Sequence, residues 1–276
     1  MKISIAGCGW LGLPLAEHLL NQGHQVKGST TTADKLALLE RKGIKPYLLK
    51  LVPEPEPHAT PLAEFLDADV LVINIPPARR HNDSDSFHAA QIQALVDHIL
   101  PLSLRKVIFI SSTSVYPSEN RVVTEADPTL HQIDVHNAIV LAENVLRKTV
   151  PLDVTVLRAG GLMGYNRIPG KYFAGQKGLT NGEVPVNFVH RDDVIAIIEQ
   201  VILQGKWNRV FNLVAPEHPL RKEIYPHTAK KFGFEVPEFA VPEQHPYKVV
   251  SSEKVCKELN YVFKYPDPLE FYYEMH

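Results

Sequence analysis

Short apolar runs alternate with helical patterns through residues 1–158, and this alternation constrains the fold more than any other feature of the sequence. The runs Lys2–Ala6 and Lys106–Ser112 have the length of strands. The run at 69–77 is almost continuously apolar, which is typical of a parallel strand covered on both faces. Repeated β–α units of this kind predict a parallel sheet with helices on both faces.

We therefore predict an α/β protein, with a Rossmann-type doubly wound parallel sheet and a small C-terminal substrate lobe. The pattern loosens into glycine- and proline-rich sequence after Arg158 and tightens again later. The dinucleotide-binding domain is accordingly expected at 1–158 and 184–213, and the small lobe at 159–183 and 214–276. A substrate cleft is expected at the carboxyl ends of the strands.

Composition excludes several other classes of protein. The formal net charge is −2, which indicates neither a nucleic-acid-binding protein nor one that binds an anionic membrane. The apolar runs are far shorter than the ~20 residues of a bilayer span. Two cysteines, Cys8 and Cys256, cannot form a disulfide framework, and no metal-ligand spacing is recognisable. We expect a cytoplasmic protein without a metal site that binds neither nucleic acid nor a membrane.

Gly7, Gly9 and Gly12 form a G-x-G-x-x-G pattern between the first strand and the first helical pattern. The first glycine allows a tight turn, the second lets a pyrophosphate approach the backbone, and the third lets helix and strand pack closely. Together with Trp10 and Leu11, this turn would present the positive end of a helix to phosphates. We predict a dinucleotide site; the alternative is a turn with a structural role only.

The residues after the second strand bear on which dinucleotide is bound. NAD sites usually place an acidic residue there, about 20 residues after the glycines. This sequence instead has the hydroxyls of Ser29, Thr30 and Thr31, followed by Lys35. Hydroxyls and a lysine suit a 2′-phosphate, so we predict NADP in preference to NAD. Capping of the next helix by the same hydroxyls is the alternative.

Further segments resemble a known family. The stretches 109–117, 156–164 and 186–198 are similar, in order and spacing, to the extended short-chain dehydrogenases/reductases, a group that includes NAD-dependent epimerases/dehydratases. The segments 211–225 and 248–272 resemble the closing elements of that family. The resemblance spans essentially the whole chain. It implies an NAD(P)-dependent oxidoreductase or epimerase/dehydratase that acts on a nucleotide-sugar-like or other small carbonyl or hydroxyl substrate.

The same resemblance implies roles for individual residues. Ser112 matches the serine whose hydroxyl bonds the reacting carbonyl; a serine that bonds its own backbone is the alternative. His190 and Asp193 match a His-x-x-Asp at a helix start, where we expect them to cap the helix. The remaining cofactor contacts that the resemblance implies are Asn74, Ile75, Pro76, Arg158, Gly160 and Leu162.

The chain departs from that family at its Tyr-x-x-x-Lys pair. Two registers of the helix are open, and they place Val135 or His136 at the Tyr position and Ile139 or Val140 at the Lys position. No tyrosine lies between residues 116 and 165. The resemblance is therefore to an atypical branch that lacks the usual proton donor.

His136 and Tyr116 are the main candidates to replace that donor, and Tyr165, Lys171 and Tyr172 are further ones. His136 titrates near physiological pH and faces the right way in one register. Tyr116 follows Ser112 by four residues and could reach the same pocket. Structural roles are the alternative for both, and a non-catalytic NADP(H)-binding sensor or partner-binding module is the rival function.

The surrounding helix is predicted over 133–150. Its apolar residues recur at helical spacing, and Glu143, Arg147 and Lys148 are expected to face water. In the family, dimers often pair this helix with that of a second copy. The sequence fits two roles for the apolar face of this helix: contact with a second copy in a homodimer, or packing in an internal core.

Overall fold

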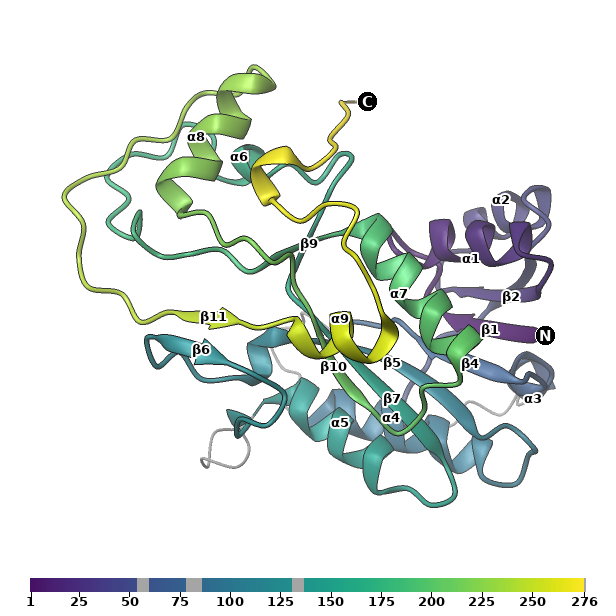
Figure 1. Cartoon of the computed structure of the whole chain (residues 1–276). Coiled ribbons are helices and arrows are strands. Elements are labelled where there is room, and N and C mark those ends of the chain that lie inside the picture. The colour runs from purple at the N-terminus through teal and green to yellow at the C-terminus, as the bar shows by residue number, and fades with distance from the viewer. Residues whose placement is uncertain (54–59, 78–85, 131–136, 276) are drawn as a thin grey trace. The chain divides into compact units, whose positions relative to one another are not determined.

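The structure, a computed structural model, describes residues 1–53, 60–77, 86–130 and 137–275 (Figure 1). It divides into two compact units, each built from several segments. The first unit comprises Met1–Val115, Pro128–Leu157 and Ile198–Val210. The second unit comprises Tyr116–Asp127, Arg158–Ile197 and Phe211–His276.

Among the described residues, seven strands form the main sheet. They are β1 (Lys2–Ala6), β2 (Gln25–Thr30), β3 (Lys45–Leu48), β4 (Val70–Ile73), β5 (Lys106–Ser112), β7 (Asp153–Ala159) and β10 (Val210–Leu213). Their order across the sheet is β10, β7, β5, β4, β1, β2, β3. β1 pairs in parallel with β2 and β4, and β2–β3 and β4–β5 are parallel as well. This order is that of a doubly wound sheet, so the predicted Rossmann-type α/β fold is confirmed.

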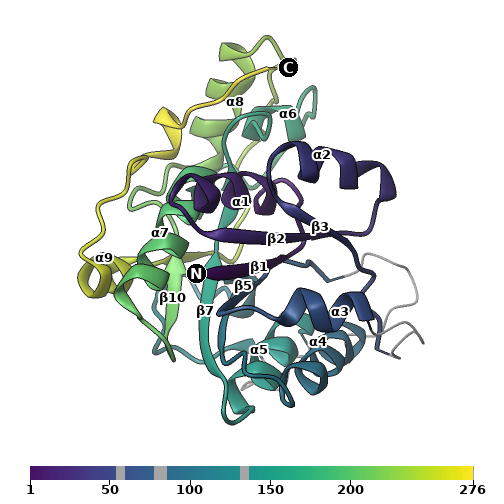
Figure 2. The same cartoon turned by 90° about the vertical axis from the view of Figure 1, so that its right-hand side faces the viewer.

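Helices follow most of these strands. They are α1 (Gly12–Asn21), α2 (Leu36–Arg41), α3 (Thr60–Leu66), α4 (Ser86–Ile99), α5 (Ala138–Lys148) and α7 (Arg191–Gln204), with the 3₁₀ turns η1 (Ala33–Lys35) and η2 (Thr113–Val115). In the first unit, α1 and α2 cover one face of the sheet, and α3, α4 and α5 cover the other (Figure 2). A helix on each face buries both sides of the strands, which explains their apolar runs.

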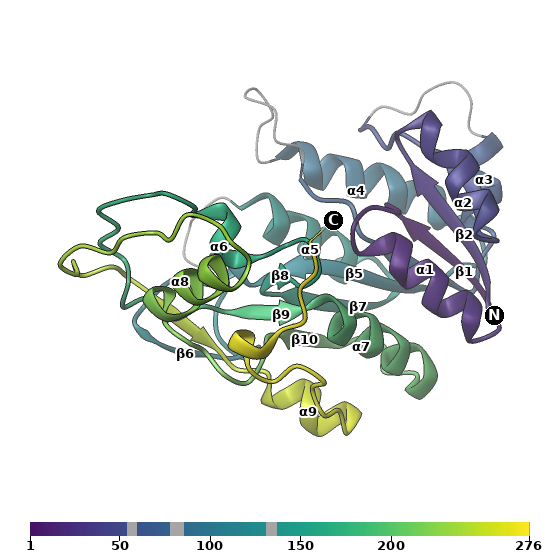
Figure 3. The ribbon, with the colours of Figure 1, turned by 90° about the horizontal axis from the view of Figure 1, so that it is seen from above.

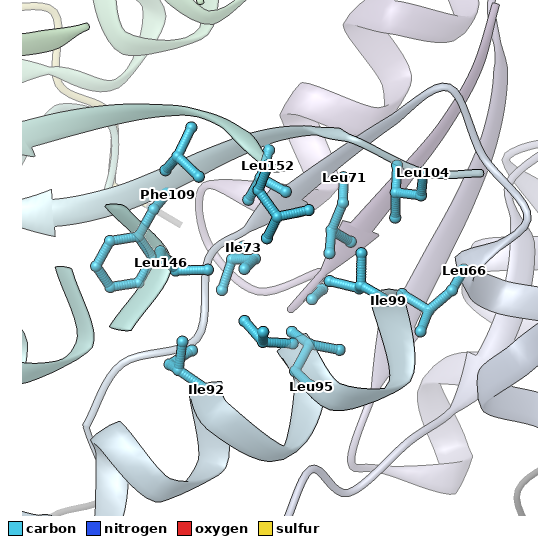
Figure 4. Close-up of a cluster of buried hydrophobic side chains, with 14 of the residues drawn as sticks. Leu66, Leu71, Ile73, Ile92, Leu95, Ile99, Leu104, Phe109, Leu146 and Leu152 are labelled. Carbon is cyan, nitrogen blue, oxygen red and sulfur yellow. The ribbon is translucent and has the colours of Figure 1, made fainter. Parts of the chain in front are cut away.

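The core of the first unit lies between the sheet and α4. Ile92, Leu95 and Ile99 recur at helical spacing on α4 and point toward Leu71 and Ile73 of β4 (Figure 4). All five side chains are at most 1% exposed. The cluster is completed by Leu66, Leu104, Phe109, Leu146 and Leu152. This packing holds β4 and β5 rigidly, and the loops at their carboxyl ends carry the residues considered below.

The second unit contains short strands and helices. These are β6 (Arg121–Val123), β8 (Gly161–Met163), α6 (Pro169–Tyr172), β9 (Phe188–His190), α8 (Arg221–Lys231), β11 (Lys248–Val250), α9 (Glu253–Leu259) and the 3₁₀ turn η4 (Pro268–Glu270). β11 pairs in parallel with β6, and β8 with β9.

α6 and α8 lie side by side (Figures 1 and 3). Gly170 allows their close approach, because a Cβ at that position would lie 2.3 Å from the backbone nitrogen of Ala229.

Candidate functional site

The glycine turn joins β1 to α1, and each glycine meets a different requirement. Gly7 has a φ of +101°, and a Cβ there would lie 2.6 Å from the carbonyl oxygen of Asn74. A Cβ on Gly12 would lie 2.1 Å from the carbonyl oxygen of Gly7. A Cβ on Gly9, in contrast, would meet no heavy atom within 4 Å. Gly7 and Gly12 are therefore required by the fold, whereas Gly9 leaves open space above the turn.

The first turn of α1 has unused hydrogen-bond donors. Leu11 is the N-cap and supplies no side-chain cap, and the first turn contains no acidic residue. Within the described residues, the N–H groups of Leu11 and Gly12 have no hydrogen-bond acceptor, and Pro14 has no N–H. Trp10, the neighbouring residue, is half-buried. Free N–H groups at the positive end of a helix, next to the open space at Gly9, fit the pyrophosphate of a dinucleotide.

The hydroxyls after β2 are used in different ways. Ser29 and Thr30 are buried, and their hydroxyl oxygens accept hydrogen bonds from the N–H groups of Gly7 (3.0 Å) and Thr32 (3.1 Å). Thr31 and Lys35 are exposed. Thr32, the residue before η1, makes no side-chain cap. The helix-capping alternative therefore does not describe this turn.

The loop after β4 contacts the glycine turn directly. The side-chain amide of Asn74 donates to the carbonyl of Gly7 at 3.1 Å. Ile75 is half-buried against the core of the first unit, and Pro76 is exposed. The structure thus places Asn74 beside the turn that the sequence analysis assigned to the phosphates.

Ser112 ends β5 and is half-buried. Its Oγ accepts a hydrogen bond from the backbone N–H of Ser114 at 3.1 Å, as the alternative in the sequence analysis expects. This bond uses one acceptor site of the hydroxyl and leaves its proton available to a further acceptor.

Glu143 does not face water, contrary to the sequence-based expectation. It is 1% exposed, and its Oε1 accepts a hydrogen bond from Ser111 Oγ at 2.5 Å. The spacing could have revealed this, because Glu143 lies three residues from both Val140 and Leu146 on the buried stripe of α5. Sequence reasoning missed Ser111 and Glu143 as a buried pair next to Ser112.

α5 begins at Ala138, with Asn137 as its N-cap. The side chain of Asn137 accepts hydrogen bonds from the N–H groups of Ile139 (3.0 Å) and Val140 (3.1 Å). His136, one of the two candidate proton donors, lies outside the described residues. In either register of the helix, the residue at the Lys position is therefore apolar: Ile139 in one and Val140 in the other.

Tyr116, the other candidate donor, belongs to the second unit and is 1% exposed. Its hydroxyl donates to Asn212 Oδ1 at 2.8 Å and accepts from an Nη of Arg158 at 2.7 Å. The guanidinium carbon of Arg158 also lies 4.9 Å from the centre of the Tyr116 ring. Burial raises the pKa of Tyr116, with the charge of Arg158 acting in the opposite direction.

Two further charged groups surround this tyrosine, and sequence reasoning missed both. Lys248 donates to the backbone carbonyl of Tyr116, and burial lowers its pKa. Glu125 accepts from the N–H of Asn212 at 2.7 Å, and burial raises its pKa. No signal in the sequence joins these residues, because they come from three separate segments.

The other residues expected near the nicotinamide also lie in the second unit. Arg158 is 2% exposed on β7. Gly160 donates its N–H to the carbonyl of Leu213 at 3.0 Å, and a Cβ there would lie 2.4 Å from the carbonyl oxygen of Asn187. Leu162 is half-buried in β8. Gly160 is thus held by a backbone hydrogen bond and by the close approach of the Asn187 carbonyl.

His190 and Asp193 have different roles at the start of α7. His190 caps the helix, because its Nδ1 accepts from the N–H of Asp192 at 3.2 Å. Its Nε2 lies 3.2 Å from the carbonyl of Tyr272 and donates to it, since Nδ1 is the acceptor. Asp193 is fully buried and instead accepts hydrogen bonds from the C-terminal segment around Tyr261.

The buried His190 makes stability depend on pH. Burial lowers its pKa, so on acidification the unfolded chain binds a proton before the folded chain does. The stabilisation is complete above the unfolded pKa of about 6.5 and is lost as pH falls toward the lower folded pKa. We expect His190→Asn to reduce the loss of unfolding free energy between pH 7.5 and 5.5 by about 1 kcal/mol.

Urea denaturation at both pH values measures this difference. His227→Asn, at an exposed position, is the control and should keep the wild-type pH dependence. Equal pH dependence in wild type and His190→Asn would contradict the attribution of the pH-dependent stability to His190.

The described residues contain neither a membrane-spanning helix nor a cluster of metal ligands. No helix in them has the length and apolar character needed to cross a bilayer. No three His, Cys, Asp or Glu side chains in this part of the chain gather to hold a metal ion. Cys8 and Cys256 are free thiols.

Comparisons with known proteins show which of them this chain resembles in sequence and in fold. No family model matches the sequence. The UDP-glucuronic acid 4-epimerase of Bacillus cereus, solved with UDP-glucuronic acid and NAD, superposes with a TM-score of 0.76 at 20% identity, over 98% of this chain and 97% of that one. A short-chain dehydrogenase/reductase superfamily protein of Agrobacterium tumefaciens with bound NAD gives 0.75 at 16% identity, over 96% and 93%.

The fold, with its glycine turn after β1, is thus the fold that these two structures share, as the sequence predicted. Protein YeeZ of Escherichia coli K12 is 38% identical over 269 residues, which cover 97% of each chain. The chain belongs to the family of Protein YeeZ.

Proposed function

We propose that the protein binds NADP(H), in preference to NAD(H), at the turn between β1 and α1. The carrying observation is the pair of unbonded N–H groups on Leu11 and Gly12 beside the open space at Gly9. Two solved structures with this fold contain NAD, which supports a nicotinamide dinucleotide. The exposed Thr31 and Lys35, with no acidic residue among 29–33, support NADP in particular.

We further propose an NAD(P)-dependent oxidoreductase or epimerase/dehydratase activity on a small carbonyl or hydroxyl substrate, such as a nucleotide sugar. A bound nicotinamide would supply hydride transfer. Ser112 would polarise the substrate oxygen, because its O–H remains available while Ser114 fixes its orientation. The second unit would carry the substrate-binding lobe.

The proton donor is the least conventional part of this proposal. The Tyr116 hydroxyl already has a donor and an acceptor, and its raised pKa opposes proton release near neutral pH. These contacts favour a structural role for the buried Tyr116 over a role as proton donor. His136 remains the candidate in the Tyr position.

The free thiols of Cys8 and Cys256 suit a reducing compartment, and we propose the cytoplasm.

A non-catalytic NADP(H) sensor is the second candidate function. The observation that favours it is the apolar pair Ile139 and Val140, one of which takes the place of the usual lysine. A sensor requires the glycine turn and neither member of the Tyr–Lys pair. A homodimer through α5 would suit either function.

Titration calorimetry with NADPH and NADH tests the shared part of both proposals. We expect saturable binding of both nucleotides, with NADPH tighter. Incubation with NADPH or NADP⁺ and a panel of nucleotide-sugar and simple carbonyl substrates then separates them. Absorbance at 340 nm reports net reduction or oxidation, and chromatography of the products reports epimerisation or dehydration, which regenerate the cofactor. Turnover abolished by Ser112→Ala supports the enzyme, and binding without turnover supports the sensor. Absence of binding by either nucleotide would contradict both.

A further inference from the structure

The backbone of Gly7 is held from two sides. Its N–H donates to Ser29 Oγ at 3.0 Å. Its carbonyl accepts from the side chain of Asn74 at 3.1 Å and from the N–H of Gly9 at 2.9 Å. Side chains from the ends of β2 and β4 therefore fix the conformation of the first glycine in the turn.

Ser29 is committed to this turn through both of its oxygens. The side chain is 4% exposed, and the backbone carbonyl accepts from the N–H of Cys8 at 2.8 Å. Two successive N–H groups of the turn thus point to one residue. This leaves the N–H groups of Leu11 and Gly12, further along, as the donors for a ligand.

Thr31 and Lys35 differ from Ser29 in exposure. Both side chains are exposed, so each can reach a ligand group outside the protein. A lysine ammonium binds phosphate as a point charge, and an exposed one does so in a salt-dependent way.

We propose that Ser29, together with Asn74, is a positioning residue that sets the affinity for NADPH and NADH alike, and that Lys35 and Thr31 discriminate between the two nucleotides. The inference rests on the proposed dinucleotide site and assigns Ser29 a role other than contact with the 2′-phosphate. Without the Ser29 and Asn74 bonds, the turn must be ordered by the ligand, and that cost is the same for both nucleotides.

The test compares Ser29→Ala with Lys35→Gln by calorimetry. Ser29→Ala is expected to weaken NADPH and NADH by the same factor, about five- to tenfold, because one buried hydrogen bond is lost. Lys35→Gln is expected to weaken NADPH about tenfold and to leave NADH unchanged. Raising the salt concentration should lower the preference for NADPH in wild type and in Ser29→Ala, and have little effect on it in Lys35→Gln.

Ser4→Ala is the matched control. Ser4 is fully buried on β1 and donates its hydroxyl to the carbonyl of Phe65 at 2.5 Å, away from the turn. Like Ser29→Ala, this substitution removes a hydrogen bond between a buried serine hydroxyl and the backbone, although Ser4 is the donor and Ser29 the acceptor, so both affinities should stay at the wild-type value. If Ser29→Ala fails to fold, Asn74→Ala tests the same claim from the other side of Gly7.

The possible results separate the positioning role of Ser29 from the proposed binding of the dinucleotide. An equal loss for both nucleotides in Ser29→Ala, with Ser4→Ala unchanged, supports the positioning role. A loss confined to NADPH, no loss at all, or the same loss in Ser4→Ala overturns it. If the wild-type protein binds neither nucleotide, the proposed function itself fails, which is a distinguishable outcome.

Discussion

Replacing Gly9 by valine is expected to weaken dinucleotide binding strongly and leave the fold intact. A Cβ at Gly9 meets no protein atom within 4 Å, so the added side chain is accommodated in the free protein. It would occupy the space next to the unbonded N–H groups of Leu11 and Gly12. Because a pyrophosphate must approach this backbone closely, we expect NADPH affinity to fall by about a hundredfold or more.

Calorimetry measures the affinity, and thermal unfolding without nucleotide checks the fold. Ala63→Val is the control, because it adds a similar branched side chain at an exposed position on α3, outside the turn. Gly12→Val provides the contrast: its Cβ would meet the Gly7 carbonyl, so it should lower the unfolding midpoint. Unchanged NADPH affinity in a folded Gly9→Val protein would contradict the proposed dinucleotide site.

These two glycines show what the sequence could and could not predict. The spacing of Gly7, Gly9 and Gly12 after an apolar run predicted the turn, because each requirement is local to a β–α connection. The same alternation of apolar runs and helical patterns predicted the parallel sheet. It could not show that Ser29 completes the turn, since that bond joins residues 22 positions apart.

The second unit was less accessible to sequence reasoning. Tyr116 looked like a candidate acid because it follows Ser112 closely in the chain. In the structure its hydroxyl is hydrogen-bonded to Arg158 and Asn212, which lie 42 and 96 residues away. Glu143 is a different case: charge suggested exposure, although its helical spacing placed it on the buried stripe.

Asp193→Ala is expected to be the most destabilising substitution in the second unit. Asp193 is fully buried and accepts hydrogen bonds from the hydroxyl of Tyr261 (2.7 Å) and the N–H groups of Lys264 (2.7 Å) and Tyr265 (3.2 Å). Removing the carboxylate leaves these donors without their acceptor and frees the C-terminal segment from α7. We expect a loss of about 3–5 kcal/mol in the free energy of unfolding.

Asp193→Asn separates hydrogen bonding from charge. Burial raises the pKa of Asp193 despite its three donors, so the ionised form is held at a desolvation cost. The amide keeps one oxygen for these donors and removes that cost, so its loss should be smaller, about 1–3 kcal/mol. Asp192→Asn, at a partly exposed neighbour, is the control and should stay within about 1 kcal/mol of wild type. Urea denaturation gives all three values. If Asp193→Ala proved no more destabilising than Asp192→Asn, the hydrogen bonds to Asp193 would not be what holds the C-terminal segment to α7.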